Sequence, residues 1–406
     1  MNEPVSIKRA FPDTTIIAML VALGLVGLAL VYSAGVAKGN LSIFYKQSLF
    51  FGIGVIAASV LTVTPPKFFY ALAYVVYVMA LFFLGAVLIL GSVGFGARRW
   101  LDLGFLVVQP SEPAKLALII ALSRLLADWR KKPSWKLVGA VGLLAMPAFV
   151  MILMQPDLGT STVFPVICLA MLAWHGIPAR YFLMLLLPFL ALITVALPYL
   201  VVPMLLTGLY WLKRAGVNWL GLAVMILICL GASVVGPKAW DHLEPYQQRR
   251  LTSFIDPAAD PLGSGYQVIQ SQVAIGSGGF AGRGFCKGTQ TQLRFLPQQH
   301  TDFIFSLAGE EFGFLGTSFI LLLYSILIWR GYQSANQIRN QFMGLAAAGM
   351  TAMLFYHSVI NIGMAMGNLP VTGLPLPFLS YGGTFLITCL AAGGVLLSAS
   401  LHRRTY

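Results

Sequence analysis

Apolar runs of about 20 residues recur along this chain, and they limit its fold more than any other feature. The first extends from Thr15 to Tyr32, and similar runs follow to the C-terminal region. A helix of about 20 apolar residues crosses the roughly 30 Å hydrocarbon core of a bilayer. Only 10% of the 406 residues are charged, against about 25% in soluble domains. The runs do not alternate as barrel strands would. The sequence therefore predicts an all-α, polytopic membrane helix bundle.

The spans themselves follow from these runs. We expect them near residues 15–34, 47–64, 70–91, 113–128, 137–154, 161–175, 181–199, 303–329, 343–366 and 384–400. The first run is too long for the core of a cleaved signal peptide, so we expect a retained helix. Further apolar sequence at 200–236 is split by Lys213-Arg214, which favours an extra helical pair and about twelve helices rather than ten. The whole chain, 1–406, is expected to form one membrane domain.

Basic residues predict the orientation of the bundle. Lys8 and Arg9 precede the first span, cations from Arg130 to Lys136 follow the fourth, and Arg403-Arg404 closes the chain. All three groups fall on one side of the predicted bundle, and cytoplasmic loops carry the excess of Lys and Arg. We therefore expect both termini in the cytoplasm and the polar loop at 237–302 outside. The net charge of +13 then reflects topology and an anionic lipid or lipid-linked partner.

Asp302 marks the point where the long polar loop re-enters the membrane. A carboxylate there is costly, which predicts a function, although capping of the following helix is the simpler interpretation. His300 is a candidate partner for Asp302. The loop also carries Lys238, Arg249, Arg250, Arg283, Lys287 and Arg294. The positive-inside bias predicts few cations in an outer loop. These residues therefore either bind an anion, or they are present because the bias does not apply to long translocated loops. The loop glycines near 276–284 form no P-loop, because no Gly-Lys-Ser/Thr follows them.

Two further clusters combine charges with helix starts. Glu112 and Lys115 are three residues apart and share a helix face. They form either an ion pair, with Glu112 bound to Lys115 or to Arg99, or part of a polar cavity for substrate. Asp157 either caps the sixth span or lines the same cavity. In the stretch from Pro370 to Thr384, prolines and glycines exclude a regular helix, and irregular backbone at a membrane span is tolerated where it lines a cavity.

Six motifs occur here in one order along the chain: Gly-Ala-Arg-Arg-Trp-Leu, Gln-Pro-Ser-Glu-Pro-Ala-Lys, Gln-Pro-Asp-Leu-Gly-Thr, Ile-Gln-Ser-Gln-Val-Ala-Ile-Gly-Ser-Gly-Gly, His-Thr-Asp-Phe-Ile-Phe and Pro-Leu-Pro-Phe-Leu-Ser-Tyr-Gly-Gly. Together they resemble the SEDS family (shape, elongation, division and sporulation) over nearly the whole chain. The segment from Gly373 to Phe378 is more similar to the RodA subfamily than to the FtsW subfamily. The stretch at 200–236 departs from the family, because most relatives run directly from the seventh span into the loop.

The resemblance implies a ten-helix core and a bacterial peptidoglycan glycosyltransferase of cell elongation in the cytoplasmic (inner) membrane. Its substrate would be lipid II, its by-product undecaprenyl pyrophosphate, and its partners a class B penicillin-binding protein transpeptidase and other membrane proteins of the elongation complex. The family's essential aspartate corresponds to Asp302, which we expect to act as a general base. A lipid II flippase and a non-catalytic scaffold of the elongation complex are the alternatives.

The same resemblance and the clusters above give the expected binding residues. No cofactor is required by the sequence, and a divalent cation (Mg²⁺ or Mn²⁺) bridging phosphates is an open alternative without a visible set of ligands. We expect the following residues to bind substrate: Arg99, Glu112, Lys115, Asp157, Arg249, Gln270, Ser271, Arg283, His300, Thr301, Ser380 and Tyr381.

Overall fold

The structure is a computed structural model. It describes residues 12–94, 97–102, 104, 107–193, 201–241, 248, 250, 252–254, 256, 263–296 and 298–402. Its elements, in chain order, are α1 (Thr14–Lys38), α2 (Ser42–Val63), α3 (Pro66–Leu90), β1 (Ser92–Gly94), β2 (Ala97–Asp102), β3 (Val107–Val108), α4 (Ser111–Ala127), α5 (Trp135–Met154), α6 (Leu158–Trp174), α7 (Ala179–Ile193), α8 (Val201–Arg214), α9 (Trp219–Asp241), α11 (Ser264–Gly278), α12 (Thr289–Gln292), α13 (Ile304–Gln337), α14 (Gln341–Ala365) and α15 (Gly383–Leu401).

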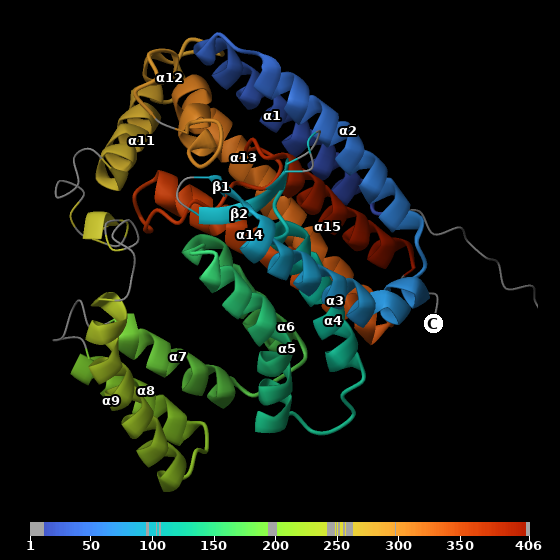
Figure 1. The fold of residues 1–406 in the computed structure, drawn as a ribbon, viewed down its shortest axis with the longest axis vertical. Helices are drawn as coiled ribbons and strands as arrows, with labels where there is room; N and C mark the ends of the chain where they lie inside the picture. Colours follow the sequence, from blue (N-terminus) through green and yellow to red (C-terminus); the bar gives the residue numbers. More distant parts are fainter. Residues whose placement is uncertain are drawn as a thin grey trace, which may run out of the picture.

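The helices form a polytopic bundle, as the apolar runs predict (Figure 1). By length and composition, seven of the described helices can cross a membrane: α1, α2, α3, α5, α13, α14 and α15. Shorter apolar helices lie within α6, α7 and α9. The predicted helical pair at 200–236 is present as α8 and α9, joined by a turn that follows Lys213-Arg214.

The core centres on α14 and α15. The helix α14 packs against α4, α6, α13 and α15, and α15 packs along α2. Small residues permit this close packing, as is usual between membrane helices. A methyl group on Gly394 would come within 2.6 Å of the Ala58 carbonyl oxygen, and one on Gly349 within 2.7 Å of Ile119. The backbones of α2 and α15 therefore approach more closely than larger side chains would allow.

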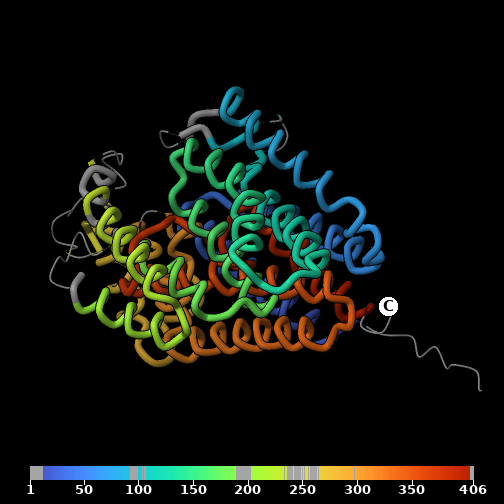
Figure 2. The backbone as a smooth tube through the Cα atoms, turned by 90° about the horizontal axis from the view of Figure 1, so that it is seen from below, coloured from blue at the N-terminus to red at the C-terminus, as the bar shows by residue number. Residues whose placement is uncertain are grey.

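The helices α7, α8 and α9 form a second, smaller hydrophobic cluster beside the main core. It contains Leu187 of α7 together with Leu212, Leu222, Met225 and Cys229 of the helical pair. The main cluster includes no residue of α8 or α9. These three helices lie on the side of the bundle away from α2 (Figure 2).

A three-stranded antiparallel sheet, β1-β2-β3, links α3 to α4. Leu101 pairs with Val108 and Asp102 with Val107. No sequence pattern noted above predicted this sheet. It places Arg99, in the middle of β2, beside the turn between α5 and α6.

The long helix α13 is broken at Gly313, where φ is +64° and ψ is −160°. Residues 279–284 lie along this break and complete its hydrogen bonds. The amides of Phe314 and Leu315 donate to the carbonyls of Gly279 and Phe280, at 2.9 and 3.1 Å. A side chain at Gly282 would collide with the Glu311 carbonyl. The loop glycines therefore allow one backbone to lie directly against another.

Candidate active site

Asp302 lies two residues before the start of α13, whose N-cap residue is Phe303 and which has no side-chain capping hydrogen bond, so the capping interpretation of Asp302 is wrong. The backbone of Asp302 is held by a side chain from another helix. Its carbonyl accepts a hydrogen bond of 2.8 Å from Nδ2 of Asn361 in α14, and the same amide group donates to the Leu374 carbonyl, also at 2.8 Å. The Asn361 side chain is fully buried. Asn361 was missed in the sequence analysis, although a buried amide within an apolar span is a signal of a fixed polar contact.

The segment after α14 packs against the residues that precede Asp302. The hydroxyl of Ser380 donates to the Thr301 carbonyl at 2.6 Å and accepts from the Leu376 amide at 2.8 Å. The Tyr381 amide donates to the His300 carbonyl at 2.8 Å. The structure thus brings His300, Thr301, Ser380 and Tyr381 together around Asp302.

Arg250 supplies a cation at this position. Its Nη1 donates to the Thr372 carbonyl at 3.1 Å. A methyl group on Gly373 would lie 3.3 Å from Arg250 Nη1 and 3.5 Å from Asp302 Oδ2, so guanidinium and carboxylate flank the same glycine. Gly373 has a φ of +75°, which an L side chain rarely adopts. The neighbouring Arg249, expected to bind substrate, lies outside the described residues.

The surroundings of Asp302 change its acidity. Burial raises the pKa of Asp302 from 3.8 to about 6. The positive charge of Arg250 and a hydrogen bond with the Thr301 side chain lower this pKa, whereas the negative charge of Asp157 raises it further. A carboxyl group with a pKa near 6 is ionised at neutral pH and is a stronger base than an ordinary aspartate. Asp302 can therefore accept a proton from a hydroxyl group beside it.

Asp157 caps α6, which confirms the capping interpretation. Its Oδ1 accepts from the Thr160 amide at 3.1 Å and its Oδ2 from the Thr160 hydroxyl at 3.0 Å. The Arg99 side chain, on β2, contacts the same turn. Its Nη1 lies 3.8 Å from Asp157 Oδ2. Its Nε donates to the Gln155 carbonyl at 3.2 Å, and its Nη2 donates to the Pro156 carbonyl. Asp157 therefore holds a turn while its charge acts on Asp302.

Glu112 and Lys115 form a buried ion pair of 2.8 Å in the first turn of α4. Both side chains are almost completely enclosed. Lys115 Nζ also lies 3.1 Å from His357 Nε2 and 5.5 Å from the centre of the Phe385 ring. Of the pairings open in the sequence, the structure shows Glu112 with Lys115. This pair joins α4 to α14 and α15, and the removal of one partner would leave a buried charge uncompensated.

His300 does not have the role first expected for it. We expected a partner for Asp302, but its ring nitrogens lie 3.3 and 3.4 Å from Lys38 Nζ, and its ring packs against Tyr381 with centres 5.6 Å apart. Burial and the Lys38 charge lower the pKa of His300 to about 4. The imidazole is therefore neutral at physiological pH, and its backbone carbonyl rather than its ring contributes to the site.

The remaining candidates make contacts that anchor the loop. Ser271 in α11 is buried and hydrogen-bonds to the Ser306 hydroxyl and to the Ala365 carbonyl. Its neighbour Gln270 is partly exposed. Arg283 donates from Nε to the Ser277 carbonyl and from Nη1 to the Thr289 hydroxyl, both at 3.0 Å. Substrate binding by these three residues stays a prediction.

A metal would have few protein ligands here. Within the described residues, no group of three His, Cys, Asp or Glu side chains lies close enough to hold one. The carboxylates of Glu112 and Asp157 already face Lys115 and Arg99. The site defined by these residues therefore combines one basic carboxylate with fixed cations, and this combination suits proton abstraction beside an anionic leaving group.

The fold defines a multi-pass membrane protein, and polar residues gather around Asp302 at one end of its helix bundle. The family model FTSW_RODA_SPOVE, described as "Cell cycle protein", matches residues 13–214 and 199–405. The chain therefore belongs to this family, which contains the FtsW, RodA and SpoVE proteins.

Individual relatives agree with this assignment. The chain is 36% identical to the peptidoglycan glycosyltransferase MrdB of Escherichia coli K12 over 97% of this chain and 94% of that protein. Its fold is similar to that of the rod shape determining protein RodA of Thermus thermophilus, with 27% identity, a TM-score of 0.66 and coverage of 99% and 100%. A chain from a structure on the coordination of polymerization and crosslinking by a peptidoglycan synthase complex gives 30% identity, a TM-score of 0.74 and coverage of 97% and 99%.

Proposed function

We propose that this protein is a peptidoglycan glycosyltransferase that polymerises lipid II into glycan strands during cell elongation. The observation that carries the proposal is the partly buried Asp302 carboxylate, whose pKa is raised to about 6. This carboxylate and the Arg250 guanidinium both lie beside Gly373. The relatives named as peptidoglycan glycosyltransferases support the reaction class.

The distribution of charge supports an outward-facing site. The end of the bundle away from Asp302 has only Asp13 and Asp128 as described acidic residues near its helix ends. Cytoplasmic surfaces carry the excess of Lys and Arg, so this end faces the cytoplasm together with both termini, and Asp302 faces outward across the inner membrane. The basic residues at this end are Lys67, Arg124, Arg130, Lys131, Lys132, Lys136, Arg180, Arg330 and Arg339.

In the proposed reaction Asp302 removes the proton from O4 of an acceptor GlcNAc. The oxygen attacks the anomeric carbon of the donor MurNAc and inverts it, while the bond from that carbon to undecaprenyl pyrophosphate breaks. The departing diphosphate takes the electron pair of the broken bond, and its negative charge is stabilised by the guanidinium group of Arg250 beside Asp302, with Arg99 as a second candidate cation. A direct inverting displacement needs one base, and Asp302 supplies it.

The buried Glu112–Lys115 pair has a positioning role in this proposal. Both charges are enclosed and compensate each other, so neither is free to bind a diphosphate. Their contact with His357 fixes α14, the helix whose Asn361 holds the Asp302 backbone.

A class B penicillin-binding protein transpeptidase is the expected partner, acting with other membrane proteins of the elongation complex. The structural neighbour from a peptidoglycan synthase complex that coordinates polymerization and crosslinking supports this kind of assembly. The new strands would pass from Asp302 on the outer face to such a transpeptidase.

The test uses purified full-length protein in detergent, with its penicillin-binding partner added where the protein alone is silent. Lipid II is supplied and glycan polymer is separated by gel electrophoresis. We expect polymer from the wild-type protein and from Asp102→Asn, a control carboxylate exposed on β2, and none from Asp302→Ala. The same proteins reconstituted into lipid vesicles report transport. Movement of lipid II across the bilayer without polymer would indicate a flippase, and neither activity would indicate a scaffold.

A further inference from the structure

Two cations and an imidazole lie together at the C-terminal end of α1, beside the segment that leads into Asp302. Lys38 is the last residue of α1, and its Nζ lies 3.3 and 3.4 Å from the two ring nitrogens of His300. Arg294 belongs to the same segment as His300, and its Nε donates to the Ala37 carbonyl at 2.9 Å. The charges of Lys38 and Arg294 are close enough to repel each other.

Within the part of the chain that the structure describes, no carboxylate compensates these two charges, and neither Lys38 nor Arg294 forms an ion pair. The carboxylate in contact with this half of α1, Glu311, accepts from the hydroxyl of Ser33. Ser33 precedes Lys38 by five residues, about 7.5 Å along the helix axis. The C-terminal dipole of α1 supplies only about half a negative charge, and the start of α2 at Ser42 adds a similar positive charge close by. Two full positive charges therefore need a counter-ion here.

The backbone of Arg294 has an unusual conformation. Its φ is +60°, in the left-handed region that favours glycine. The amide donates to the Thr291 carbonyl at 3.1 Å, and the guanidinium is tied to Ala37, so both ends of the residue are fixed. Strained residues of this kind concentrate at active sites and ligand-binding positions. An arginine where glycine would fit better therefore indicates a use for its guanidinium.

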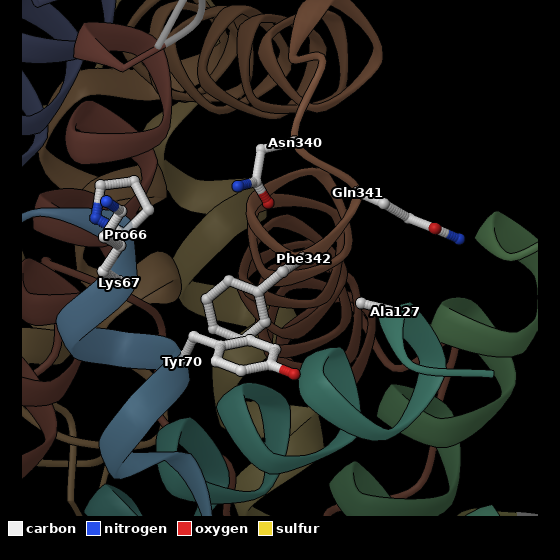
Figure 3. A pocket seen from close by; sticks show the side chains of 7 residues that line it. All are labelled: Pro66, Lys67, Tyr70, Ala127, Asn340, Gln341 and Phe342. Carbon is white, nitrogen blue, oxygen red and sulfur yellow. The ribbon is translucent and has the colours of Figure 1, made fainter. Parts of the chain in front are cut away.

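A cation at the other end of the bundle shows the contrast. Figure 3 shows Tyr70 in the wall of a hollow there. The Arg124 guanidinium lies 4.5 Å from the centre of the Tyr70 ring, and its Nε lies 3.9 Å from Asp128 Oδ2. Arg124 thus packs helices together with an acidic partner, whereas Lys38 and Arg294 have none among the described residues.

The depth of these cations in the membrane favours one kind of anion. The helix α1 is long enough to cross a bilayer, so Lys38 at its end lies at the level of the lipid headgroups. Arg294 and His300 contact this end and lie at the same level. A lipid-linked diphosphate is held at this depth by its own polyprenyl chain, whereas the peptide of lipid II extends into water. The position therefore suits a diphosphate better than a peptide carboxylate.

The reaction proposed above brings two diphosphates to the protein. When two lipid II molecules condense, the diphosphate of the donor leaves and the acceptor keeps its own. Arg250, beside Asp302, is placed for the leaving diphosphate. The retained one lies a disaccharide away from the O4 atom that Asp302 deprotonates, so it needs a second cationic position nearby. His300, which contacts Lys38, is two residues from Asp302, and their Cα atoms are at most about 7 Å apart.

We propose that Lys38 and Arg294 form the subsite for the diphosphate of the acceptor lipid II, an inference that rests on the proposed function. The ammonium and guanidinium groups bind the phosphate oxygens, and the neutral His300 ring keeps the Lys38 ammonium in place. Bound there, the acceptor presents its GlcNAc O4 to Asp302, and no bond of its own diphosphate breaks. Arg250 serves the diphosphate that leaves.

The first experiment measures binding without polymerisation. Full-length Asp302→Asn protein in detergent is titrated with lipid II, and native mass spectrometry counts the bound molecules. We expect two lipid II molecules per protein. Adding Lys38→Gln or Arg294→Gln should weaken one of the two sites about fivefold, the contribution of one basic residue near an anionic lipid group. Both changes together should weaken it about twenty-fivefold, and undecaprenyl pyrophosphate should compete for this site.

The matched control is Lys46→Gln, which removes an exposed cation near the start of α2, beside the end of α1. It should leave both sites unchanged. Elution volume and melting temperature establish that each variant is folded. If Arg294→Gln does not fold, Arg294→Gly replaces it, because glycine suits the left-handed backbone, and it should weaken binding to the same extent.

The second experiment measures polymerisation in the chain with Asp302 intact. Lys38→Gln and Arg294→Gln should raise the KM for lipid II about fivefold and change kcat much less, because the reacting atoms keep their base and Arg250. Absence of polymer from the wild-type protein would refute the proposed function itself. Polymer from the wild type, with unchanged lipid II binding and KM in both variants, would refute the subsite alone.

Three further results would overturn the subsite. Lys46→Gln could weaken binding as much as Lys38→Gln, which would indicate a general effect of surface charge. Displacement of lipid II by an equal concentration of phosphatidylglycerol would assign the cations to bulk anionic lipid. Competition by the soluble muramyl pentapeptide, without competition by undecaprenyl pyrophosphate, would assign them to a peptide carboxylate.

Discussion

Replacement of Asp302 by asparagine should abolish polymerisation and at the same time stabilise the folded protein. Burial raises the pKa of Asp302 from 3.8 to about 6, so the folded state disfavours the ionised carboxylate. One pKa unit corresponds to about 1.4 kcal/mol, and the difference between the two values to about 3 kcal/mol. Because the side chain keeps some contact with solvent, we expect Asp302→Asn to gain about 1–3 kcal/mol at pH 8.

This gain should depend on pH in a defined direction. Below the unfolded pKa of about 3.9 Asp302 is protonated in both states, and the wild-type protein has no penalty. Between pH 4 and 6 the unfolded chain ionises first, so the wild-type protein loses stability as pH rises, and above pH 6 the loss is complete. The asparagine variant does not titrate at this position. Its advantage should therefore be large at pH 8 and small at pH 4.

The measurement is the melting temperature of both proteins in the same detergent at pH 4, 6 and 8, beside the polymerisation assay. Asp102→Asn is the control, because it neutralises a carboxylate that is exposed on β2. It should change the free energy of unfolding by less than about 0.5 kcal/mol. An Asp302→Asn protein that melts below the wild type at pH 8 would refute the claim that the carboxylate is held at an energetic cost.

Three further predictions concern the neighbours of Asp302. Polymerisation should decline below pH 6, because only the ionised carboxylate accepts a proton. Arg250→Gln should move the midpoint of the pH–rate curve upward, since Arg250 lowers the pKa of Asp302. An unmoved midpoint would contradict this. Lys115→Met should destabilise the protein by about 3–5 kcal/mol in thermal unfolding, because it leaves the Glu112 carboxylate buried without its partner. Glu112→Leu in the same chain should restore most of this loss. Equal losses in the single and double variants would show that packing, not charge, is responsible. Gly373→Ala should lower the polymerisation rate about tenfold or more, because its methyl group meets Arg250 and Asp302 in a left-handed backbone; a wild-type rate would remove Gly373 from the site.

The sequence was sufficient for those features that depend on local pattern. Apolar runs predicted the helices, including the pair α8 and α9, because the apolar length of a helix is a property of the run itself. That this pair crosses the membrane stays a prediction, since α8 has 14 residues and is shorter than a span. The capping of α6 by Asp157 and the pairing of Glu112 with Lys115 were also accessible, since both involve residues three apart on one helix.

Features that depend on distant segments were not accessible. The contact of Asn361 with the Asp302 carbonyl joins residues 59 positions apart, and no local pattern indicates it. The position of Arg250 beside Gly373 joins residues more than 120 positions apart, and no local pattern in the loop indicates it. The pairing of residues 279–284 with the break at Gly313 likewise requires the folded chain, because each backbone completes the hydrogen bonds of the other.

The separate hydrophobic cluster of α7, α8 and α9 has an evolutionary consequence. Because α8 and α9 contribute no residue to the main cluster, a chain without them would keep every residue of the core that supports Asp302. Such a hairpin is a module that a lineage can acquire or lose with changes confined to α7, whose Leu187 packs against it. Its lipid-facing side chains, such as Trp219 and Leu227, can then diverge under selection for new neighbours in the membrane while the reaction site stays under its own, stricter constraint.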